Sequence, residues 1–300
     1  MDSLDELQTS MQRARDSYAT GDYREACRLC EQALVIGEQF LDHAQPDNAA
    51  AINTLAAFLQ ILGAYAAARP LAERALAICE QMLGPDHPAT ARSLHNLAAL
   101  LRIQGKYAHA RPLAERALAI DETLYGKQHP EVATDLNTLV LLLKDLSEYE
   151  LAYPLAERAL FIRQQMLGPE HPDTARSANT LAELMRLQGD YVNARPLAEQ
   201  AVAIDETVYG KQHPEVATDL NTLATLLREQ GEYARARRLA AQALAIHEQV
   251  LGPTHPETAR SLNTLGEQHH SQGEYTAARQ LYERALAIRE QVFGPNHPET

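Results

Sequence analysis

The chain has 300 residues, of which 45% are hydrophobic and 22% are charged, and its formal net charge is −13. This composition is typical of a globular protein and excludes a disordered chain. The acidic balance repels nucleic-acid phosphates and argues against binding to DNA or RNA. No apolar run approaches the roughly 18 to 20 residues of a transmembrane helix, so we expect no membrane association.

Two features recur every 42 residues along the whole chain. The first is a tyrosine, found at Tyr23, Tyr65, Tyr107, Tyr149, Tyr191, Tyr233 and Tyr275. The second is a His-Pro pair, which begins at His87, His129, His171, His213, His255 and His297 and is replaced by Gln45-Pro46 in the first copy. A strict period of this length indicates stacked units, each stable only beside its neighbours. We therefore expect residues 1–300 to form a single array of seven repeats.

Each copy has the pattern of a helical hairpin. Apolar and small residues recur at helical spacing on both sides of a break such as Gln104-Gly105-Lys106. The first helix, helix A, is expected to begin at the proline of His-Pro, a residue that suits the first helical position, and to end at the glycine. The second, helix B, begins near the tyrosine and tolerates an early proline such as Pro112. Alanines such as Ala110 and Ala117 allow neighbouring helices to approach closely.

The expected elements follow in chain order from this period. The repeats are expected at about 4–46, 47–88, 89–130, 131–172, 173–214, 215–256 and 257–298. Their A helices are expected at about 4–20, 47–62, 89–104, 131–146, 173–188, 215–230 and 257–272. Their B helices are expected at about 23–42, 65–83, 107–125, 149–167, 191–209, 233–251 and 275–293.

The two ends of the array differ. The first helix A is divergent and is expected to be an N-terminal cap. The last residues, 298–300, repeat the opening of a helix A, which would leave apolar side chains of the preceding helix B uncovered. We expect either a fragment of a longer protein or end-to-end self-association through the C-terminal repeat.

The order of these features resembles the tetratricopeptide repeat. The shared features are an apolar helix A, a Q-G-x-Y turn and two alanines seven residues apart in helix B. The repeat length, the L-A-E-R-A-L-A-I segment and the L-G-P-x-H-P linker resemble the kinesin-light-chain variant of that repeat. The resemblance implies an all-α, right-handed α-solenoid of about fourteen antiparallel helices, with the A helices lining a concave groove. It does not imply a role in motors, because the repeat is a general scaffold.

An asparagine recurs at the centre of the A-helix face expected to line the groove. The positions are Asn53, His95, Asn137, Asn179, Asn221 and Asn263, with one histidine among five asparagines. An amide can both donate and accept a hydrogen bond, which suits capture of an extended peptide backbone. The alternative is a hydrogen bond between neighbouring repeats, shared among the copies because they arose by duplication. Residues 121–139 and 205–223 differ only at Leu124/Val208, which supports such duplication.

Basic residues flank the asparagines on the same helix face. They are Arg92, Arg176 and Arg260 on the N-terminal side and Arg102, Lys144, Arg186 and Arg228 on the C-terminal side. Arginine recognises carboxylates and phosphates through paired hydrogen bonds. The pattern predicts a groove for an extended, acidic peptide segment of a protein partner. Pairing with Glu183 and Glu267, which lie among the basic residues, is the alternative.

Other chemistry is not indicated. The His-Pro histidines are at least one interhelical spacing of about 8–10 Å apart, whereas zinc ligands lie about 2 Å from the metal. Cys27 and Cys30 form a C-x-x-C within a helical pattern, and we interpret them as small buried side chains because no second pair completes a zinc site. We expect no metal, no cofactor and no enzymatic activity, since no catalytic or nucleotide-binding motif occurs. Few aromatic residues are present for stacking on RNA bases.

Two classes of function remain. The first is a scaffold or adaptor whose groove binds a peptide of a partner. The second is a sensor or regulatory segment of a larger multidomain signalling protein, with an NTPase or protease part outside this chain, which resembles what long bacterial arrays of this type do. Without a recognisable signal peptide or a disulfide framework, we expect a cytoplasmic protein.

Overall fold

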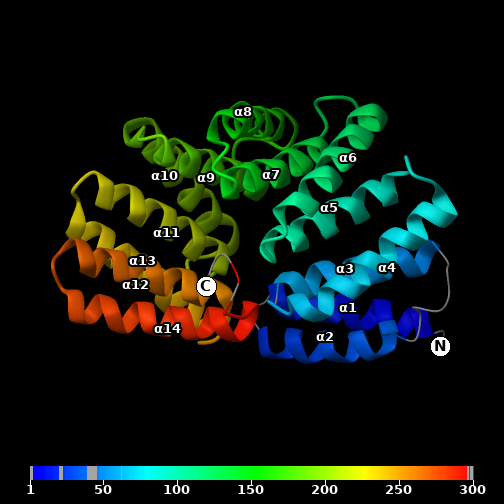
Figure 1. The fold of residues 1–300 in the computed structure, drawn as a ribbon, viewed down its shortest axis with the longest axis horizontal. Helices are drawn as coiled ribbons and strands as arrows, with labels where there is room; N and C mark the ends of the chain where they lie inside the picture. Colours follow the sequence, from blue (N-terminus) through cyan, green and yellow to red (C-terminus); the bar gives the residue numbers. More distant parts are fainter. Residues whose placement is uncertain (1–2, 20–22, 39–45, 62, 296, 298–299) are drawn as a thin grey trace. The chain divides into compact units, whose positions relative to one another are not determined.

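The structure, a computed structural model, describes residues 3–19, 23–38, 46–61, 63–295, 297 and 300. Throughout this part of the chain the regular secondary structure is helical, and no strand occurs (Figure 1). The A helices are α1 (Ser3–Ala19), α3 (Pro46–Ile61), α5 (Pro88–Ile103), α7 (Pro130–Asp145), α9 (Pro172–Leu187), α11 (Pro214–Glu229) and α13 (Pro256–Ser271). The B helices are α2 (Tyr23–Glu38), α4 (Tyr65–Leu83), α6 (Tyr107–Tyr125), α8 (Tyr149–Met166), α10 (Tyr191–Tyr209), α12 (Tyr233–Val250) and α14 (Tyr275–Phe293). The predicted all-α class and the alternation of helices A and B are confirmed.

The histidine before each proline caps the A helix that follows. His171 Nδ1 accepts a hydrogen bond from the backbone N–H of Asp173 at 3.1 Å, and His213 Nδ1 accepts one from Glu215 N at 3.2 Å. The proline then occupies the first helical position, where a missing N–H has no cost. Equivalent caps are made by His87, His129 and His255. The A helices from α3 to α13 therefore begin at the proline, as the His-Pro pattern predicts, one residue before the approximate ranges expected for them.

Glycines with positive φ end most A helices. Gly105 and Gly189 have φ values of 69° and 85°, a region where a side chain is strained. In the fourth repeat Ser147 stands in place of the glycine and has a φ of 61°. Among the described residues it is the non-glycine residue with a positive φ. A left-handed conformation costs an L-residue about 1–2 kcal/mol. The fourth hairpin therefore turns at some cost in stability.

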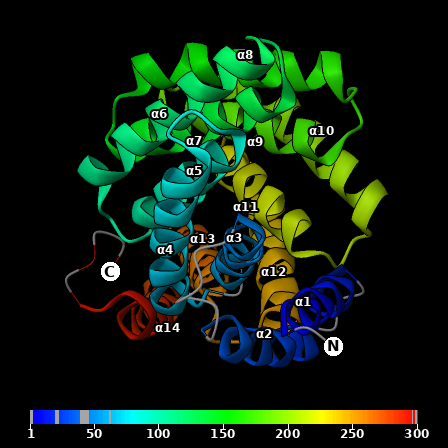
Figure 2. The same cartoon turned by 90° about the vertical axis from the view of Figure 1, so that its right-hand side faces the viewer.

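Neighbouring helices pack through small residues. Each helix B packs against its own helix A, and α4, α8, α10 and α12 also pack against the helix A of the next repeat. Ala194 and Ala201 of α10 and Ala236 and Ala243 of α12 are fully buried in these contacts, which confirms the predicted role of the paired alanines. Figure 2 shows α7, α8 and α9 side by side in this arrangement.

The contacts divide the chain into two compact units, Met1–Lys127 and Gln128–Thr300. The boundary falls in the linker between α6 and α7, so each unit contains whole repeats. Continuity of a single array across this linker, and its handedness, stay predictions. Gln45, residues 298–299 and the Cys27 side chain lie outside what the structure describes, whereas Cys30 is buried.

The ends of the described chain differ as expected. In α1, Leu7, Met11 and Ala14 are buried while Glu6 and Arg13 are exposed, the pattern of a cap with a polar outer face.

The C-terminal edge is more apolar. Leu286 of α14 is 41% exposed, whereas its equivalent in α12, Leu244, is covered by α13. Self-association through this edge stays a prediction.

Within the described residues no helix combines the length and apolar character needed to cross a bilayer.

Candidate functional site

The central A-helix positions lie largely within the packing between repeats. Asn53, Asn137 and Asn221 are buried, with exposures of 3%, 9% and 2%. His95, Asn179 and Asn263 are half-buried at the equivalent positions. The hydrogen bonds of these side chains therefore decide between a packing role and a binding role.

Two of the asparagines join neighbouring repeats. Asn53 Nδ2 donates to Ser93 Oγ, and Asn221 Nδ2 donates to Ser261 Oγ at 2.7 Å. This confirms the inter-repeat hydrogen bond for the amide nitrogens of these two residues. Their Oδ1 atoms are buried without a hydrogen-bond partner, a situation that costs about 1–3 kcal/mol for a polar group. These two oxygens are therefore unsatisfied acceptors.

A buried polar residue of helix B recurs at the joints between repeats, and we did not predict it from the sequence. It follows the isoleucine of helix B in successive repeats, as Cys79, Asp121, Arg163, Asp205 and His247. Three of these residues contact a serine of the next helix A, in the pairs Cys79–Ser93 at 3.4 Å, Arg163–Ser177 at 2.9 Å and His247–Ser261 at 2.8 Å. The available signal was a polar residue at fixed register inside an otherwise apolar helical segment.

The neighbours of His247 define which of its two ring nitrogens carries the proton. Its Nε2 lies 3.2 Å from the carbonyl oxygen of Pro214, and its Nδ1 lies 2.8 Å from Ser261 Oγ. A carbonyl oxygen only accepts, so Nε2 carries the proton and Nδ1 accepts from the serine hydroxyl. Burial lowers the pKa of His247 to about 4, and the imidazole is therefore neutral at pH 7.

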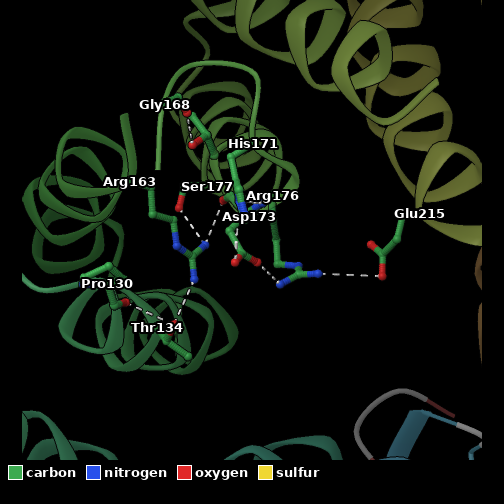
Figure 3. A network of polar contacts seen from close by, with 10 residues as sticks. Pro130, Thr134, Arg163, Gly168, His171, Asp173, Arg176, Ser177 and Glu215 are labelled. Atoms are coloured by element: carbon green, nitrogen blue, oxygen red, sulfur yellow. Dashed lines mark hydrogen bonds and ion pairs between the residues drawn. The ribbon is translucent and has the colours of Figure 1, made fainter. Parts of the chain in front are cut away.

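Arg163 occupies the same position two repeats earlier and makes a different set of bonds (Figure 3). Its Nη1 donates to the backbone oxygen of Asp173 at 3.0 Å and to Ser177 Oγ at 2.9 Å. Its Nη2 donates to Thr134 Oγ1 at 3.2 Å, so the guanidinium joins α7, α8 and α9. Burial lowers the pKa of Arg163 to about 10, which leaves it charged at pH 7.

In the repeat between those of Arg163 and His247, the equivalent residue is Asp205, which pairs with another carboxyl group. Asp205 of α10 and Asp219 of α11 are both buried and hydrogen-bond to each other. Burial raises the pKa of both groups, because two adjacent carboxylates cannot both ionise easily in a dry interface. The residues that join successive repeats therefore differ in chemistry from one joint to the next.

The basic residues of the A helices are partly paired with carboxylates. Lys144 Nζ lies 2.9 Å and Arg260 Nη2 lies 3.7 Å from the Glu183 carboxylate, and Arg228 Nη1 lies 3.4 Å from Glu267 Oε2. Burial opposes ionisation of Glu183, but the charges of Lys144 and Arg260 outweigh it and lower the pKa to about 2. The predicted alternative of internal pairing with Glu183 and Glu267 is thus confirmed for these contacts.

Arg176 of α9 contacts carboxylates of two A helices, α9 and α11. Its Nη1 lies 2.7 Å from Asp173 Oδ1 in the same helix, and its Nη2 lies 4.0 Å from Glu215 Oε1 of α11 (Figure 3). The side chain is nearly half exposed, so these pairs contribute little to stability. Arg176 remains accessible to solvent.

A polar hollow of about 240 Å³ opens among α9, α11, α13 and α14. It is lined by Glu183, Arg186, Asn221, Thr222, Thr225, Arg228, Arg260, Asn263, Thr264, Glu267 and Arg289. Four arginines face two glutamates, so the hollow is positive in a chain of net negative charge. Arg228 Nε is buried there without a hydrogen-bond partner. The hollow therefore holds both an unpaired acceptor, Asn221 Oδ1, and an unpaired donor.

Asn263 is oriented by Arg289. With its amide oxygen toward α14, Asn263 Oδ1 accepts from Arg289 Nη1 at 3.0 Å and from Nη2 at 3.1 Å. The guanidinium can only donate, so the opposite orientation would place two donors against each other. The Asn263 nitrogen is consequently directed away from Arg289.

The hollow brings together five of the predicted site residues. These are Arg186, Asn221, Arg228, Arg260 and Asn263. Lys144 reaches its edge through Glu183, whereas Asn137, Asn179 and Arg176 lie elsewhere in the second unit. Asn53, Arg92, His95 and Arg102 belong to the first unit. Within the described residues no cluster of three or more His, Cys, Asp or Glu side chains could hold a metal ion.

Comparisons with known proteins agree with this architecture. The family model described as tetratricopeptide repeat matches residues 47–123, 131–207, 180–249, 215–291 and 262–300. A comparison with curated proteins gives no match.

Solved structures with the same fold include three informative relatives. A protein of Podosopora anserina named for kinesin light chain and for nearly identical TPR-like repeats is 27% identical, with 68% of this chain and 97% of that chain covered and a TM-score of 0.52. BtubC (BKLC) from P. vanneervenii is 24% identical, with coverage of 80% and 94% and a TM-score of 0.55. The Rap conjugation gene regulator of plasmid pLS20, solved with the Phr* peptide, is 13% identical, with coverage of 97% and 75% and a TM-score of 0.74. The last two likenesses concern the fold alone.

Proposed function

The chain belongs to the tetratricopeptide repeat family, and from this premise we propose that it binds an extended, acidic peptide segment of a protein partner along its A helices. The hollow among α9, α11, α13 and α14 is the centre of this site. Its occupant presents carboxylates to the arginines and backbone groups to the asparagines. The protein acts as an interaction scaffold, and the groove performs no chemistry on the bound segment.

The positive hollow in an acidic chain is the observation that carries the proposal. Four arginines converge on one surface although the chain as a whole has a net charge of −13. Gathering like charges costs self-repulsion, and Glu183 and Glu267 neutralise only part of it. Carboxylates of a partner would neutralise the remainder through charge-assisted hydrogen bonds.

The unpaired atoms of the hollow support a peptide rather than a simple anion. Asn221 Oδ1 needs a donor and Arg228 Nε needs an acceptor. A peptide segment supplies both, because its backbone N–H groups donate and its carbonyl and carboxylate oxygens accept. An inorganic anion would supply acceptors only.

The alternative role, a sensor or regulatory segment of a larger signalling protein, uses the same groove. It differs in what is joined to residues 1–300 and stays a prediction. The pLS20 regulator was solved in complex with the Phr* peptide. For this chain, we propose a peptide ligand because of the residues that line the hollow, and not because of that likeness.

Selection from a random peptide library displayed on phage tests the proposal. We expect the full chain to enrich peptides rich in Asp and Glu. The best peptide, labelled with a fluorophore, is then titrated by anisotropy against the wild type, Arg228→Gln and Arg237→Gln. Arg237 lies in α12 and pairs with Glu274 at 3.0 Å outside the hollow, so it is a matched control.

The expected loss is specific to the hollow. Removing one charge-assisted contact of about 1.5–3 kcal/mol weakens binding by roughly tenfold or more, so Arg228→Gln should bind at least tenfold more weakly than the wild type. Arg237→Gln should bind like the wild type. Enrichment of peptides without acidic character, or equal losses in both variants, would overturn the proposal.

A further inference from the structure

We propose that His247, acting through Ser261, fixes the orientation of the Asn221 amide and thereby makes this position of the groove select a hydrogen-bond donor on the ligand. The inference rests on the proposed peptide groove and adds to it a positioning residue that determines specificity. His247 is buried in α12 and touches no ligand itself.

The orientation follows from a chain of hydrogen bonds that begins at a backbone carbonyl. The Pro214 oxygen can only accept, so His247 Nε2 donates to it and Nδ1 is left as an acceptor. Ser261 therefore donates its hydroxyl proton to His247 Nδ1. Its oxygen is then left to accept, and the group that faces it is the Asn221 nitrogen, at 2.7 Å.

The consequence appears on the groove side of Asn221. With its nitrogen held by Ser261, the amide has Oδ1 as its remaining hydrogen-bonding atom, and this buried oxygen has no partner among the described residues. Asn221 is 2% exposed and lines the hollow. A buried acceptor in this place favours a ligand N–H or O–H and disfavours a ligand oxygen without a proton.

Arg163 reverses the first step of this chain. A guanidinium only donates, so Ser177 Oγ accepts from Arg163 Nη1 and keeps its own proton for another acceptor. Asn137 is the asparagine of that joint. We expect its amide oxygen to face Ser177 and its nitrogen to face the groove. On this inference the identity of the buried B-helix residue sets whether the groove position accepts or donates.

The two joints can exchange these residues because their surroundings correspond. Arg163 is held by Thr134, Ser177 and the backbone oxygen of Asp173. Two repeats later the same places hold Thr218, Ser261 and Glu257. An arginine introduced by His247→Arg would therefore find the same kinds of hydrogen-bond partner as Arg163. We expect this variant to fold and the Asn221 amide to change its orientation.

The exchange rate of the Asn221 side-chain amide with water tests the orientation without any ligand. The full chain is labelled with ¹⁵N-asparagine, and the Asn221 signal is identified by its disappearance in Asn221→Asp. In the wild type the nitrogen is held by Ser261 and exchange is slow. In His247→Arg and in Ser261→Ala we expect exchange about tenfold faster, because the nitrogen loses its hydrogen-bond acceptor. Ser261→Thr keeps the hydroxyl and should restore slow exchange.

A ligand experiment tests the specificity. The acidic peptide selected on the wild type is resynthesised with single backbone N–H groups replaced by ester oxygens. One such replacement should weaken binding to the wild type by about tenfold. The same replacement should have little effect on binding to His247→Arg, whose Asn221 presents a donor.

The outcomes separate this inference from the proposed function. Fast exchange of the Asn221 amide in the wild type, or an exchange rate unchanged by His247→Arg, overturns the role of His247 whether or not a peptide binds. Failure of the library to yield an acidic peptide overturns the proposed function alone. If a peptide binds but no ester replacement distinguishes the wild type from His247→Arg, the selection of a donor at Asn221 is wrong.

Discussion

The buried histidine makes the stability of the second unit depend on pH, and the variant His247→Gln isolates this dependence. The pKa of His247 falls from an ordinary 6.5 to about 4, chiefly because burial disfavours the charged ring. Since each pH unit between these values corresponds to about 1.4 kcal/mol, neutral His247 contributes about 3 kcal/mol at pH 7.

The sign follows from where the protons bind. Between pH 6.5 and 4 the unfolded chain binds a proton that the folded chain does not, so acidification favours unfolding. The contribution is fully present above about pH 6.5 and is lost progressively as the pH falls to about 4. Glutamine at position 247 has no such proton to bind.

The assay is urea unfolding followed by circular dichroism at a series of pH values from about 8 to about 4. The unfolding free energy of the wild type should fall by about 3 kcal/mol more than that of His247→Gln over this range. The variant His109→Gln removes an exposed histidine of α6 and should keep the wild-type dependence. Parallel pH curves for the wild type and His247→Gln would show that His247 is not the source of this pH dependence.

Three further predictions concern buried or strained positions of the fold. Asp219→Asn should be more stable than the wild type at about pH 8 and equally stable at about pH 4, because burial raises the pKa of Asp219 and its loss of a proton destabilises the fold; equal stabilities in urea at both pH values would contradict this. Ser147→Gly should raise the unfolding free energy by about 1 kcal/mol by relieving a positive φ, whereas Gly189→Ala, at φ 85° and with open space around it, should lower it by a similar amount. Gly266→Ala should be destabilised by about 1–3 kcal/mol, because its Cβ would lie 2.5 Å from Tyr282 Cε1. Tyr282→Ala should cancel that loss in a double-mutant cycle measured by thermal unfolding, and additive losses would show that the clash is absent.

The fold could be predicted closely because its rules are local and repeat. The bounds of α4, α6, α10 and α14 agree with the prediction at both ends, since a tyrosine begins each helix and a glycine follows it. The A helices from α3 onward begin at the predicted proline, whereas the cap that the Nδ1 atom of the preceding histidine makes was not predicted. Ser147 could not be foreseen as a left-handed residue, because serine does not favour that conformation.

The site was predicted less completely because its hydrogen bonds depend on contacts between repeats. The asparagine pattern is the same whether the amide holds a ligand or a neighbouring helix, and only the position of Ser261 shows that Asn221 does the second with its nitrogen. The role of His247 required the distance to Ser261, which no spacing along the chain reveals. The clustering of Arg186, Arg228 and Arg260 did follow from the period, because equivalent positions of stacked helices share a face.

Photo-cross-linking of the selected acidic peptide locates its binding site on the chain. The peptide carries a photoreactive residue, is irradiated with the full wild-type chain, and the linked residues are identified by mass spectrometry. Binding along the A helices predicts cross-links in α9, α11 and α13, close to Arg186, Asn221 and Asn263. Cross-links confined to the B helices α10 and α12 would place the peptide outside the hollow and show that the A helices do not bind it.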